Sequence, residues 1–321
     1  MVKRLITAVA LLLAGITVTP AAQNLTIANS IGGTSPQQTA VDAFVAEIDR
    51  LLPGRFTISK KGGSALGGEQ DIWEALRLGA LDLAIITTTS IAPVVPLLGI
   101  FDVPYLFRDA AHAAKVLKGP IGNELGAKIN GSGAVFLGFA DRGFRHLTNS
   151  RRPVLKPLDV AGLKIRVIPN PVMEAIFKTL GAEVVPLPVT EMFGALREGR
   201  IDGQENPLLV IEARHLEQVQ KFLSLTGHTY SPVVILISAD THKTLKPHER
   251  AAFARAASAA AAASRQAVID REAAAIAALN LKGVVIDTID REAFIAALKP
   301  LQPEWERRFG AALLKRIRDT Q

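Results

Sequence analysis

Short apolar segments alternate with longer amphipathic segments along most of this 321-residue chain. The apolar segments have the length of buried strands, and the segments between them carry the 3.6-residue periodicity of helices. This alternation favours an α/β fold, in which each strand is followed by a helix that packs on the sheet. The first predicted elements are a strand at 25–28, a helix at 37–52, a strand at 56–59, a helix at 69–78 and a strand at 83–86.

The chain is longer than one hydrophobic core ordinarily supports, which predicts two domains. Residues 75–82 (ALRLGALD) resemble residues 195–202 (ALREGRID). Each segment has the pattern of the last turn of a helix, a glycine that ends it and the lead into a strand. The match indicates equivalent units in two α/β lobes, although shared capping chemistry or chance explains so short a match equally well.

The segment from Pro247 to Leu279 is rich in alanine and has no internal glycine or proline. Alanine is the best helix former, so this segment predicts one helix of about 30 residues, roughly 45 Å long. A helix of that length is able to run across both lobes, whereas a coiled-coil surface would need larger residues at its a and d positions. A strand at 284–286 and helices at 291–298 and 303–317 are predicted after it.

The N-terminus has the features of a secretory signal peptide. Lys3 and Arg4 precede an uncharged apolar run at 5–18, which ends in small residues near Ala21 and Ala22. A membrane anchor is the alternative, but a run of about 14 residues is shorter than the ~20 that span a bilayer. We therefore expect cleavage near Ala21 or Ala22. The chain has no cysteine, and the absence of disulfides and of a lipid-modified cysteine fits a bacterial periplasm.

The formal net charge of the chain is +7, but its basic residues are spread along the sequence rather than gathered in one patch. Because the chain has few aromatic residues to stack on bases, this pattern does not indicate nucleic-acid binding. A modest positive field would help to attract small anions, although an ordinary solvated surface explains the charge as well.

Motifs of the common enzyme classes are missing from the sequence. It has no Gly-x-Ser-x-Gly elbow, no His-Glu-x-x-His pair and no cysteine nucleophile, and its six histidines lack metal-ligand spacing. The glycine-rich segment 62–68 lacks the lysine of a phosphate-binding loop. Asp202 and Glu205 form an imaginable acid–base pair, but we interpret them as solvated loop positions. The sequence therefore predicts a protein that is not an enzyme and carries no metal or cofactor.

Arg166 lies on a short apolar strand at 163–167 that runs into Pro169, Asn170 and Pro171. Asn170 is a good N-cap and Pro171 a good first residue for a helix. The free N–H groups of that helix and the guanidinium would then face the same point, which is an arrangement that holds an anion. An arginine paired with a structural carboxylate is the alternative interpretation, and these residues alone do not decide between the two.

Two motifs stand out, GLKIRV at 162–167 and DGQENP at 202–207. They are accompanied by SALGGE at 64–69, FDVPYLF at 101–107, GFRHLTN at 143–149, LGA at 180–182, the segment 190–201 and VQKF at 219–222. Together these motifs resemble those of DctP-type solute-binding proteins, which serve tripartite ATP-independent periplasmic (TRAP) transporters. The resemblance covers most of the mature chain.

The resemblance implies roles for individual residues. Arg166 matches the main carboxylate clamp of the family, Arg145 a second ligand-contacting arginine, and Asn206 a ligand-contacting amide. Glu69 matches an acidic position of the first lobe near the cleft. Val189 stands where many members carry phenylalanine, which widens the expected pocket. For Asn206 there is a simpler interpretation, as a cap of the helix that follows it.

The resemblance also implies a two-lobed periplasmic-binding-protein fold with a hinge, an interlobe cleft and a long helix that spans both lobes. The chain would cross between the lobes near Asp141 and near Tyr230. The predicted boundaries are 1–22 for the signal peptide, 23–142 with 232–271 for the first lobe, 143–231 with 280–321 for the second, and 248–279 for the long helix.

The function expected from these features is capture of a small organic acid anion, of the sugar-acid or C4-dicarboxylate type, in the periplasm. The resemblance implies a monomer that delivers the acid to the small and large TRAP membrane subunits, whose transport is driven by an ion gradient. Two alternatives stay open: a ligand-sensing module for a receptor, and a periplasmic enzyme that acts on an organic acid.

Overall fold

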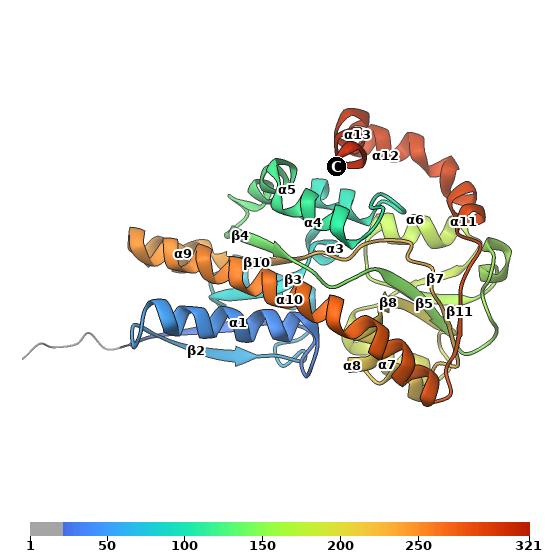
Figure 1. Cartoon of the computed structure of the whole chain (residues 1–321), viewed down its shortest axis with the longest axis horizontal. Helices are drawn as coiled ribbons and strands as arrows, with labels where there is room; N and C mark the ends of the chain where they lie inside the picture. Colours follow the sequence, from blue (N-terminus) through green and yellow to red (C-terminus); the bar gives the residue numbers. More distant parts are fainter. Residues whose placement is uncertain (1–21) are drawn as a thin grey trace, which may run out of the picture.

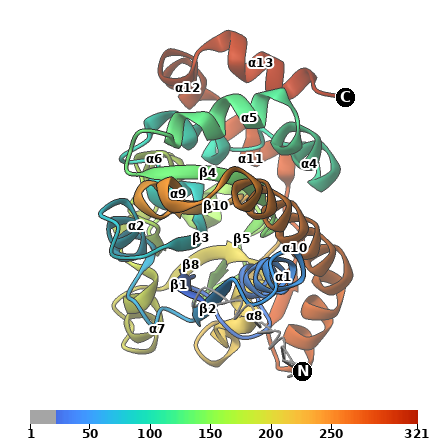
Figure 2. The ribbon, with the colours of Figure 1, turned by 90° about the vertical axis from the view of Figure 1, so that its left-hand side faces the viewer.

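The structure, a computed structural model, describes residues 22–321 of the chain. Apart from Ala22, the signal peptide predicted at 1–22 lies outside the described residues. Within them, no helix combines the length and the apolar character that a membrane crossing requires. The described chain folds into two α/β lobes, each built around one sheet (Figures 1 and 2).

The sheet of the first lobe has five strands in the order β2-β1-β3-β10-β4. β1 runs parallel to β2 and β3, while β10 runs antiparallel between β3 and β4. The strands are Gln23–Ala28 (β1), Phe56–Lys61 (β2), Leu83–Thr87 (β3), Ala134–Ala140 (β4) and Val233–Ser238 (β10), and the helices around them are Pro36–Leu51 (α1), Glu69–Arg77 (α2), Thr88–Ile91 (α3), Ala110–Lys118 (α4), Pro120–Gly126 (α5) and Ala239–Thr244 (α9).

The sheet of the second lobe has six strands in the order β11-β9-β5-β8-β6-β7. β6 is parallel to both of its neighbours, and β5 is antiparallel to both of its own. The strands are Arg145–Asn149 (β5), Lys164–Val167 (β6), Glu183–Pro186 (β7), Gly203–Pro207 (β8), Phe222–Ser224 (β9) and Val285–Asp287 (β11), and the helices around them are Pro171–Thr179 (α6), Val189–Arg197 (α7) and Leu208–Ala213 (α8).

The similar segments at 75–82 and 195–202 occupy equivalent places in the two sheets. Helix α2 leads through Gly79 into β3, and α7 leads through Gly199 into β8. Both glycines adopt positive φ angles, 74° and 68°, which are strained for residues with a Cβ. The shared sequence therefore marks the same helix-to-strand turn in each lobe.

The chain passes between the sheets after β4 and again before β10, close to Asp141 and Tyr230. Helix α10, Pro247–Leu281, forms a third connection, because it packs on α1 and β4 of the first lobe and on α8 of the second (Figure 1). It is a single helix of 35 residues, as the alanine-rich segment predicts. Buried alanines such as Ala256 and Ala260 line its face toward the first sheet.

The C-terminal helices turn from the second lobe back over the first. Helix α11, Arg291–Leu298, packs near α6, and α12, Gln302–Phe309, packs near the short helix at Pro96–Asp102. Helix α13, Ala311–Asp319, lies beside α4 and α5 (Figure 2). The imidazole Nε2 of His112 in α4 lies 2.8 Å from the carbonyl oxygen of Ile317 in α13. The end of the chain is thus fastened to the first lobe.

The single helix predicted at 303–317 is wrong. Gly310 adopts a φ of 87° between α12 and α13 and breaks the helical path there. A residue with a Cβ would be strained in this conformation, so the glycine is what allows the turn. The residue boundaries predicted for the two lobes stay a prediction.

Buried apolar clusters stabilise the molecule, and two of them involve the first lobe. One lies between α1, α10 and the first sheet, where the Phe44 and Phe253 rings meet edge to face with centroids 5.8 Å apart. The other contains Trp73 of the first lobe together with Phe177 and Phe294 from the side of the second lobe. Apolar contacts therefore cross between the lobes and hold them together.

Candidate functional site

A small cavity lies where the carboxyl ends of strands from the two sheets face each other. Ligands of open α/β sheets bind at this edge, because the loops that follow the strands converge there. The cavity has a volume of about 10 Å³, roughly the room that one water molecule needs, so the lobes are closed around it. Its lining consists of Ser30, Glu69, Gln70, Ser90, Arg142, Arg166, Ile168, Val189 and Asn206.

Arg166 is a buried cation on the wall of this cavity. Its side chain extends from β6, the residue is 1% exposed, and its Nε donates to the carbonyl oxygen of Leu187 at 2.8 Å. Among residues 22–321 it forms no ion pair and no other side-chain hydrogen bond. Burial lowers the pKa of Arg166 to about 9, with the nearby Arg145 and Arg142 adding to the effect and Glu205 opposing it. The guanidinium therefore stays charged at neutral pH and lacks an anion.

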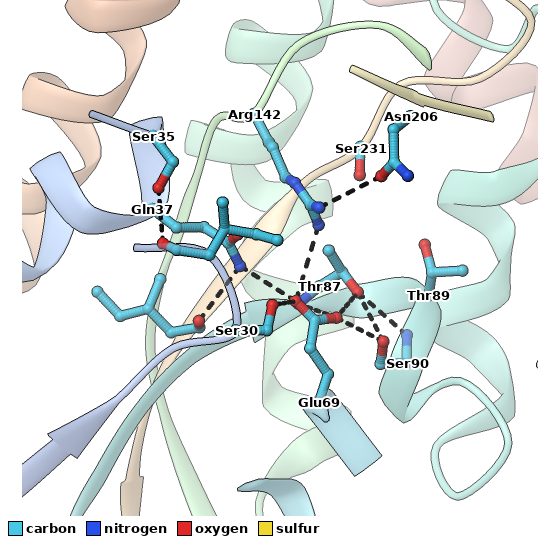
Figure 3. Close-up of polar contacts among 12 residues, drawn as sticks. Ser30, Ser35, Gln37, Glu69, Thr87, Thr89, Ser90, Arg142, Asn206 and Ser231 are labelled. Atoms are coloured by element: carbon cyan, nitrogen blue, oxygen red, sulfur yellow. Dashed lines mark hydrogen bonds and ion pairs between the residues drawn. The ribbon is translucent and has the colours of Figure 1, made fainter. Parts of the chain in front are cut away.

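Arg142 is a second cation of the cavity, and the sequence analysis missed it. The residue is 3% exposed and lies in the segment that crosses from β4 to β5. Its Nη2 donates to Oδ1 of Asn206 at 3.4 Å, and its Nη1 lies 3.7 Å from Oε1 of Glu69 (Figure 3). Nε and Nη1 are buried without a hydrogen-bond partner. Burial lowers the pKa of Arg142 to about 10, so it too remains protonated.

Glu69 begins helix α2 and is enclosed by hydrogen-bond donors, as Figure 3 shows. Burial alone would raise the pKa of this carboxyl, but the charge of Arg142 and the hydroxyl donors outweigh it and lower the pKa. Glu69 is therefore a fixed anion that balances part of the charge of Arg142. Its donors are Ser30 Oγ at 2.7 Å, Gln37 Nε2 at 3.1 Å, Thr87 N at 3.2 Å, Thr87 Oγ1, and Ser90 Oγ at 2.5 Å.

Arg145 lies at the start of β5, completely buried, and does not line the cavity. Its Nε and Nη2 donate to the carboxylate of Glu205, with Nη2 2.8 Å from Oε1, and its Nη1 donates to Oγ of Ser231 at 3.2 Å. All of its nitrogens are thus engaged by the protein. The ligand contact that the resemblance implies for Arg145 stays a prediction.

The interpretation of Glu205 as a solvated loop residue is wrong. Glu205 belongs to β8, where it is fully buried against Arg145, and its Oε2 lies 3.2 Å from Nε2 of His228. Burial would raise the pKa of Glu205, but the charge of Arg145 and the hydrogen bond from His228 lower it to about 2. The carboxylate is an anchor for Arg145 and carries no free acid–base function.

Asn206 accepts hydrogen bonds from both Arg142 and Arg145. Its Oδ1 accepts from Arg142 at 3.4 Å and from Arg145 at 3.3 Å, while its Nδ2 donates to Gln204 Oε1 at 2.5 Å. The simpler interpretation of Asn206 as a helix cap is wrong, because Pro207 is the N-cap of α8 and no side chain caps that helix. Asn206 therefore sits in the cavity wall as an amide that both cations orient.

Asn170 caps α6, as its position before Pro171 predicts. Its Oδ1 accepts from the backbone N–H of Val172 at 2.8 Å, and its Nδ2 donates across the lobe boundary to Thr89 O at 2.9 Å and Asp102 Oδ2 at 3.2 Å. Asn170 is not part of the cavity lining. Its observed role is to connect the lobes, and a contact of Asn170 with a ligand stays a prediction.

Val189 is the first residue of α7 and lines the cavity. Val189 and Ile168 are the two apolar residues of the lining. Within residues 22–321, no group of His, Asp and Glu side chains is arranged to hold a metal ion. The site as a whole offers two buried cations, one anion and several hydroxyl and amide groups, which suits a small polar anion.

The family model described as bacterial extracellular solute-binding protein, family 7 (DctP) matches residues 27–308 of the chain. The chain is 36% identical over 279 residues to the 2,3-diketo-L-gulonate-binding periplasmic protein YiaO of Escherichia coli, which covers 87% of this chain and 85% of the relative.

Two solved structures of TRAP periplasmic solute-binding proteins are very similar in fold. One is from Polaromonas and is bound to D-erythronate, with a TM-score of 0.92 and 37% identity over 93% of this chain and 99% of that one. The other is from Bordetella bronchiseptica, with electron density interpreted as pantoate, a TM-score of 0.91 and 39% identity over the same shares of the two chains.

Proposed function

Because the chain belongs to the bacterial extracellular solute-binding proteins of family 7, the DctP-type proteins of TRAP transporters, we propose that it captures a short hydroxylated organic acid between its lobes. Family membership makes it a solute-binding protein and not an enzyme. The acid is held in the cavity described above and is delivered to TRAP membrane subunits. The chain acts as a periplasmic monomer after its signal peptide is cleaved near Ala21 or Ala22.

The proposal that the ligand is a carboxylate rests on one observation. Among residues 22–321, the guanidinium of Arg166 has no ion-pair partner. A carboxylate placed against its terminal nitrogens would accept two parallel N–H···O bonds. Hydrogen bonds to charged groups contribute about 1.5–3 kcal/mol each, and burial of Arg166 limits competition from water. Arg142 supplies a second positive charge within the same cavity, so the ligand carboxylate offsets the repulsion between the two cations.

The ligand class follows from the other groups in the wall. Ser30, Gln70, Ser90 and Asn206 offer hydroxyl and amide groups that suit the hydroxyls of a sugar acid. The fixed anion Glu69 would repel a second carboxylate placed near it, which favours a monocarboxylate over a C4-dicarboxylate. The Polaromonas structure is bound to D-erythronate, and density in the Bordetella structure is interpreted as pantoate. Both acids are butanoates with hydroxyls at C2 and C4. We therefore propose a short 2-hydroxy monocarboxylate.

Closure of the lobes would accompany binding. Besides Asn170, Arg214 at the end of α8 reaches across the boundary and donates to the carbonyl oxygen of Ser30 at 2.6 Å and to Ser64 Oγ at 3.1 Å. These contacts require the lobes to be close together. Because the cavity here has room for about one water molecule, the lobes in the proposed cycle part far enough to admit the acid and then close against it. The membrane subunits would recognise the surface of that liganded form.

The test is a thermal-shift screen followed by calorimetry. We expect D-erythronate or pantoate to raise the unfolding midpoint, since a ligand at 100 times its Kd adds about 2.7 kcal/mol of stability. Arg166→Ala should weaken binding tenfold or more, Arg166→Lys should recover part of the loss, and Arg197→Ala at an exposed position of α7 should have no effect. Failure of every organic acid tested would overturn the ligand class, and near wild-type affinity of Arg166→Ala would overturn the clamp.

A further inference from the structure

A second, larger cavity lies between the first lobe and the C-terminal helices. Its volume is about 810 Å³, and it shares no lining residue with the interlobe cavity. One wall is the chain around Tyr105, after the short helix at Pro96–Asp102, and the other is formed by α11, α12 and the end of α13. Sites for small organic molecules commonly have volumes of about 300–1,000 Å³.

The polar part of the lining is predominantly cationic. Arg108, Arg291, Lys299 and Arg318 face this cavity, and Glu292 is the one acidic residue among those that line it. Within residues 22–321, none of the four cations forms an ion pair with a carboxylate. All four side chains are exposed, so water screens the repulsion among them. Their positive charge alone therefore does not define a binding site. An anion in the cavity would nevertheless interact favourably with all of them.

Trp305 of α12 supplies a second and independent feature. The residue is 3% exposed and lines the cavity, and its indole Nε1 is buried without a hydrogen-bond partner. An indole N–H is only a donor, so it needs an acceptor such as a carboxylate oxygen. Because Nε1 itself has almost no accessible surface, an anion in the cavity would reach it after the indole turns toward the cavity. The indole of Trp73 also lacks a partner, but Trp73 does not line this cavity.

Tyr105 forms the opposite, aromatic wall in a constrained conformation. Its φ of 55° lies in the left-handed region that non-glycine residues rarely adopt, and its N–H donates to the carbonyl oxygen of His228 at 2.9 Å. The guanidinium of Arg291 lies 5.1 Å from the centre of the Tyr105 ring, within cation–π distance. Strained backbone conformations persist where the surrounding structure fixes them, and they are frequent at functional sites. Here the conformation of Tyr105 places its aromatic ring beside the guanidinium of Arg291.

We propose that this cavity is a second binding site, which takes an organic anion with an apolar or aromatic body. The body would contact Tyr105 and the apolar side chains of α11, and the carboxylate would accept from the indole of Trp305 and pair with Arg291 and Lys299. The site is independent of the solute cavity. Since its walls belong to the first lobe and to the C-terminal helices, a bound anion would tie the end of the chain to that lobe.

The proposal is tested with 4-tert-butylbenzoate and its neutral counterpart 4-tert-butylbenzamide, titrated calorimetrically into the Arg166→Ala variant so that the solute clamp does not contribute. We expect one equivalent of the benzoate to bind and the amide to bind at least tenfold more weakly. Arg291→Gln and Lys299→Met should each weaken benzoate binding about fivefold or more. Arg255→Gln, an exposed arginine of α10, is the matched control and should leave it unchanged.

Trp305 also provides a direct readout. In a Trp73→Phe variant it is the one remaining tryptophan, and its emission should change on addition of the benzoate, whereas the emission of Trp73 in a Trp305→Phe variant should not. Equal binding of the amide, wild-type affinity in both Arg291→Gln and Lys299→Met, or no binding at millimolar benzoate would each overturn the proposal. None of these results bears on the solute site, which the acid screen tests separately.

Discussion

The hydroxyl of Tyr230 donates a 2.6 Å hydrogen bond to Oδ1 of Asp141, and this bond joins the two chain segments that cross between the sheets. Arg265 of α10 pairs with Oδ2 of the same carboxylate at 2.5 Å. One carboxylate thus fastens both crossing segments to the helix that contacts both lobes. Binding proteins close about such segments, so in the proposed closure this cluster would keep the lobes in register.

Asp141→Asn should therefore destabilise the fold while leaving the cavity residues in place. The amide keeps the shape of the side chain but leaves the mostly buried charge of Arg265 without a counter-ion. Removing one partner of a buried ion pair costs about 3–5 kcal/mol, and because Arg265 is partly exposed we expect about 3 kcal/mol in urea unfolding. Asp240→Asn, which breaks an exposed pair with Lys243, should cost less than about 1 kcal/mol. Equal losses in both variants would contradict the proposed role of Asp141.

Arg142→Met should weaken binding of the organic acid tenfold or more and should also destabilise the protein. The loss of stability is expected because Glu69 would keep its buried negative charge without its cation. Arg142→Lys should restore part of both properties. Thermal unfolding and calorimetry of the three proteins measure the two effects separately.

A double variant separates the role of Arg142 in folding from its role in binding. Adding Glu69→Gln to Arg142→Met removes both charges, so stability should recover relative to Arg142→Met alone. Affinity for the acid should remain low, because the cation that the carboxylate needs is still missing. Recovery of affinity in the double variant would show that Arg142 acts only by neutralising Glu69.

Much of the fold was predictable because its signals are local. The alternation of apolar and amphipathic segments predicts the strands β1 to β3 and their connecting helices, and the alanine-rich composition predicts α10. The error at 303–317 is also local in origin, since helical periodicity continues on both sides of Gly310 and a single glycine does not always end a helix.

The candidate site was less predictable, because burial and partner choice depend on contacts between distant segments. Arg166 was found from the strand-to-helix pattern, which indicates an anion site without knowledge of the fold. Arg142 was not predicted because it lies just before the GFRHLTN motif at 143–149, in which Arg145 is the arginine that the resemblance identifies. Only the pairing of β5 with β8 shows that Arg145 is occupied by Glu205. A buried acid such as Glu205 after a glycine has no distinguishing local signal.

Asp102 should make the stability of the closed protein depend on pH. Burial raises the pKa of this carboxyl to about 7 from its ordinary value of 3.8, although Thr89, Arg145 and Asn170 oppose the shift. The folded state therefore holds a proton that the unfolded chain releases. The stabilisation is complete below about pH 4 and is lost as pH rises through about 7.

Asp102→Asn should flatten this dependence. The amide mimics the protonated carboxyl and still accepts from Asn170, so stability at pH 8 should rise relative to the wild type, by on the order of 1–3 kcal/mol. Urea unfolding at pH 5, 6.5 and 8 measures the slope for both proteins. A wild-type slope that persists in the variant would assign the pH dependence to another group.

Val189→Phe should convert the cavity to one that selects by size. Val189 lines the cavity. When the lobes part to admit a solute, a phenyl ring at this position would fill space that the smaller valine side chain leaves free. A four-carbon acid such as D-erythronate should lose little affinity, whereas a six-carbon aldonate should lose tenfold or more because its far end would meet the ring. Calorimetry should measure the affinity of both acids for the wild type, for Val189→Phe and for the conservative control Val189→Ile. If both acids lose affinity equally in Val189→Phe, residue 189 supports the fold of α7 and does not set the length of the solute.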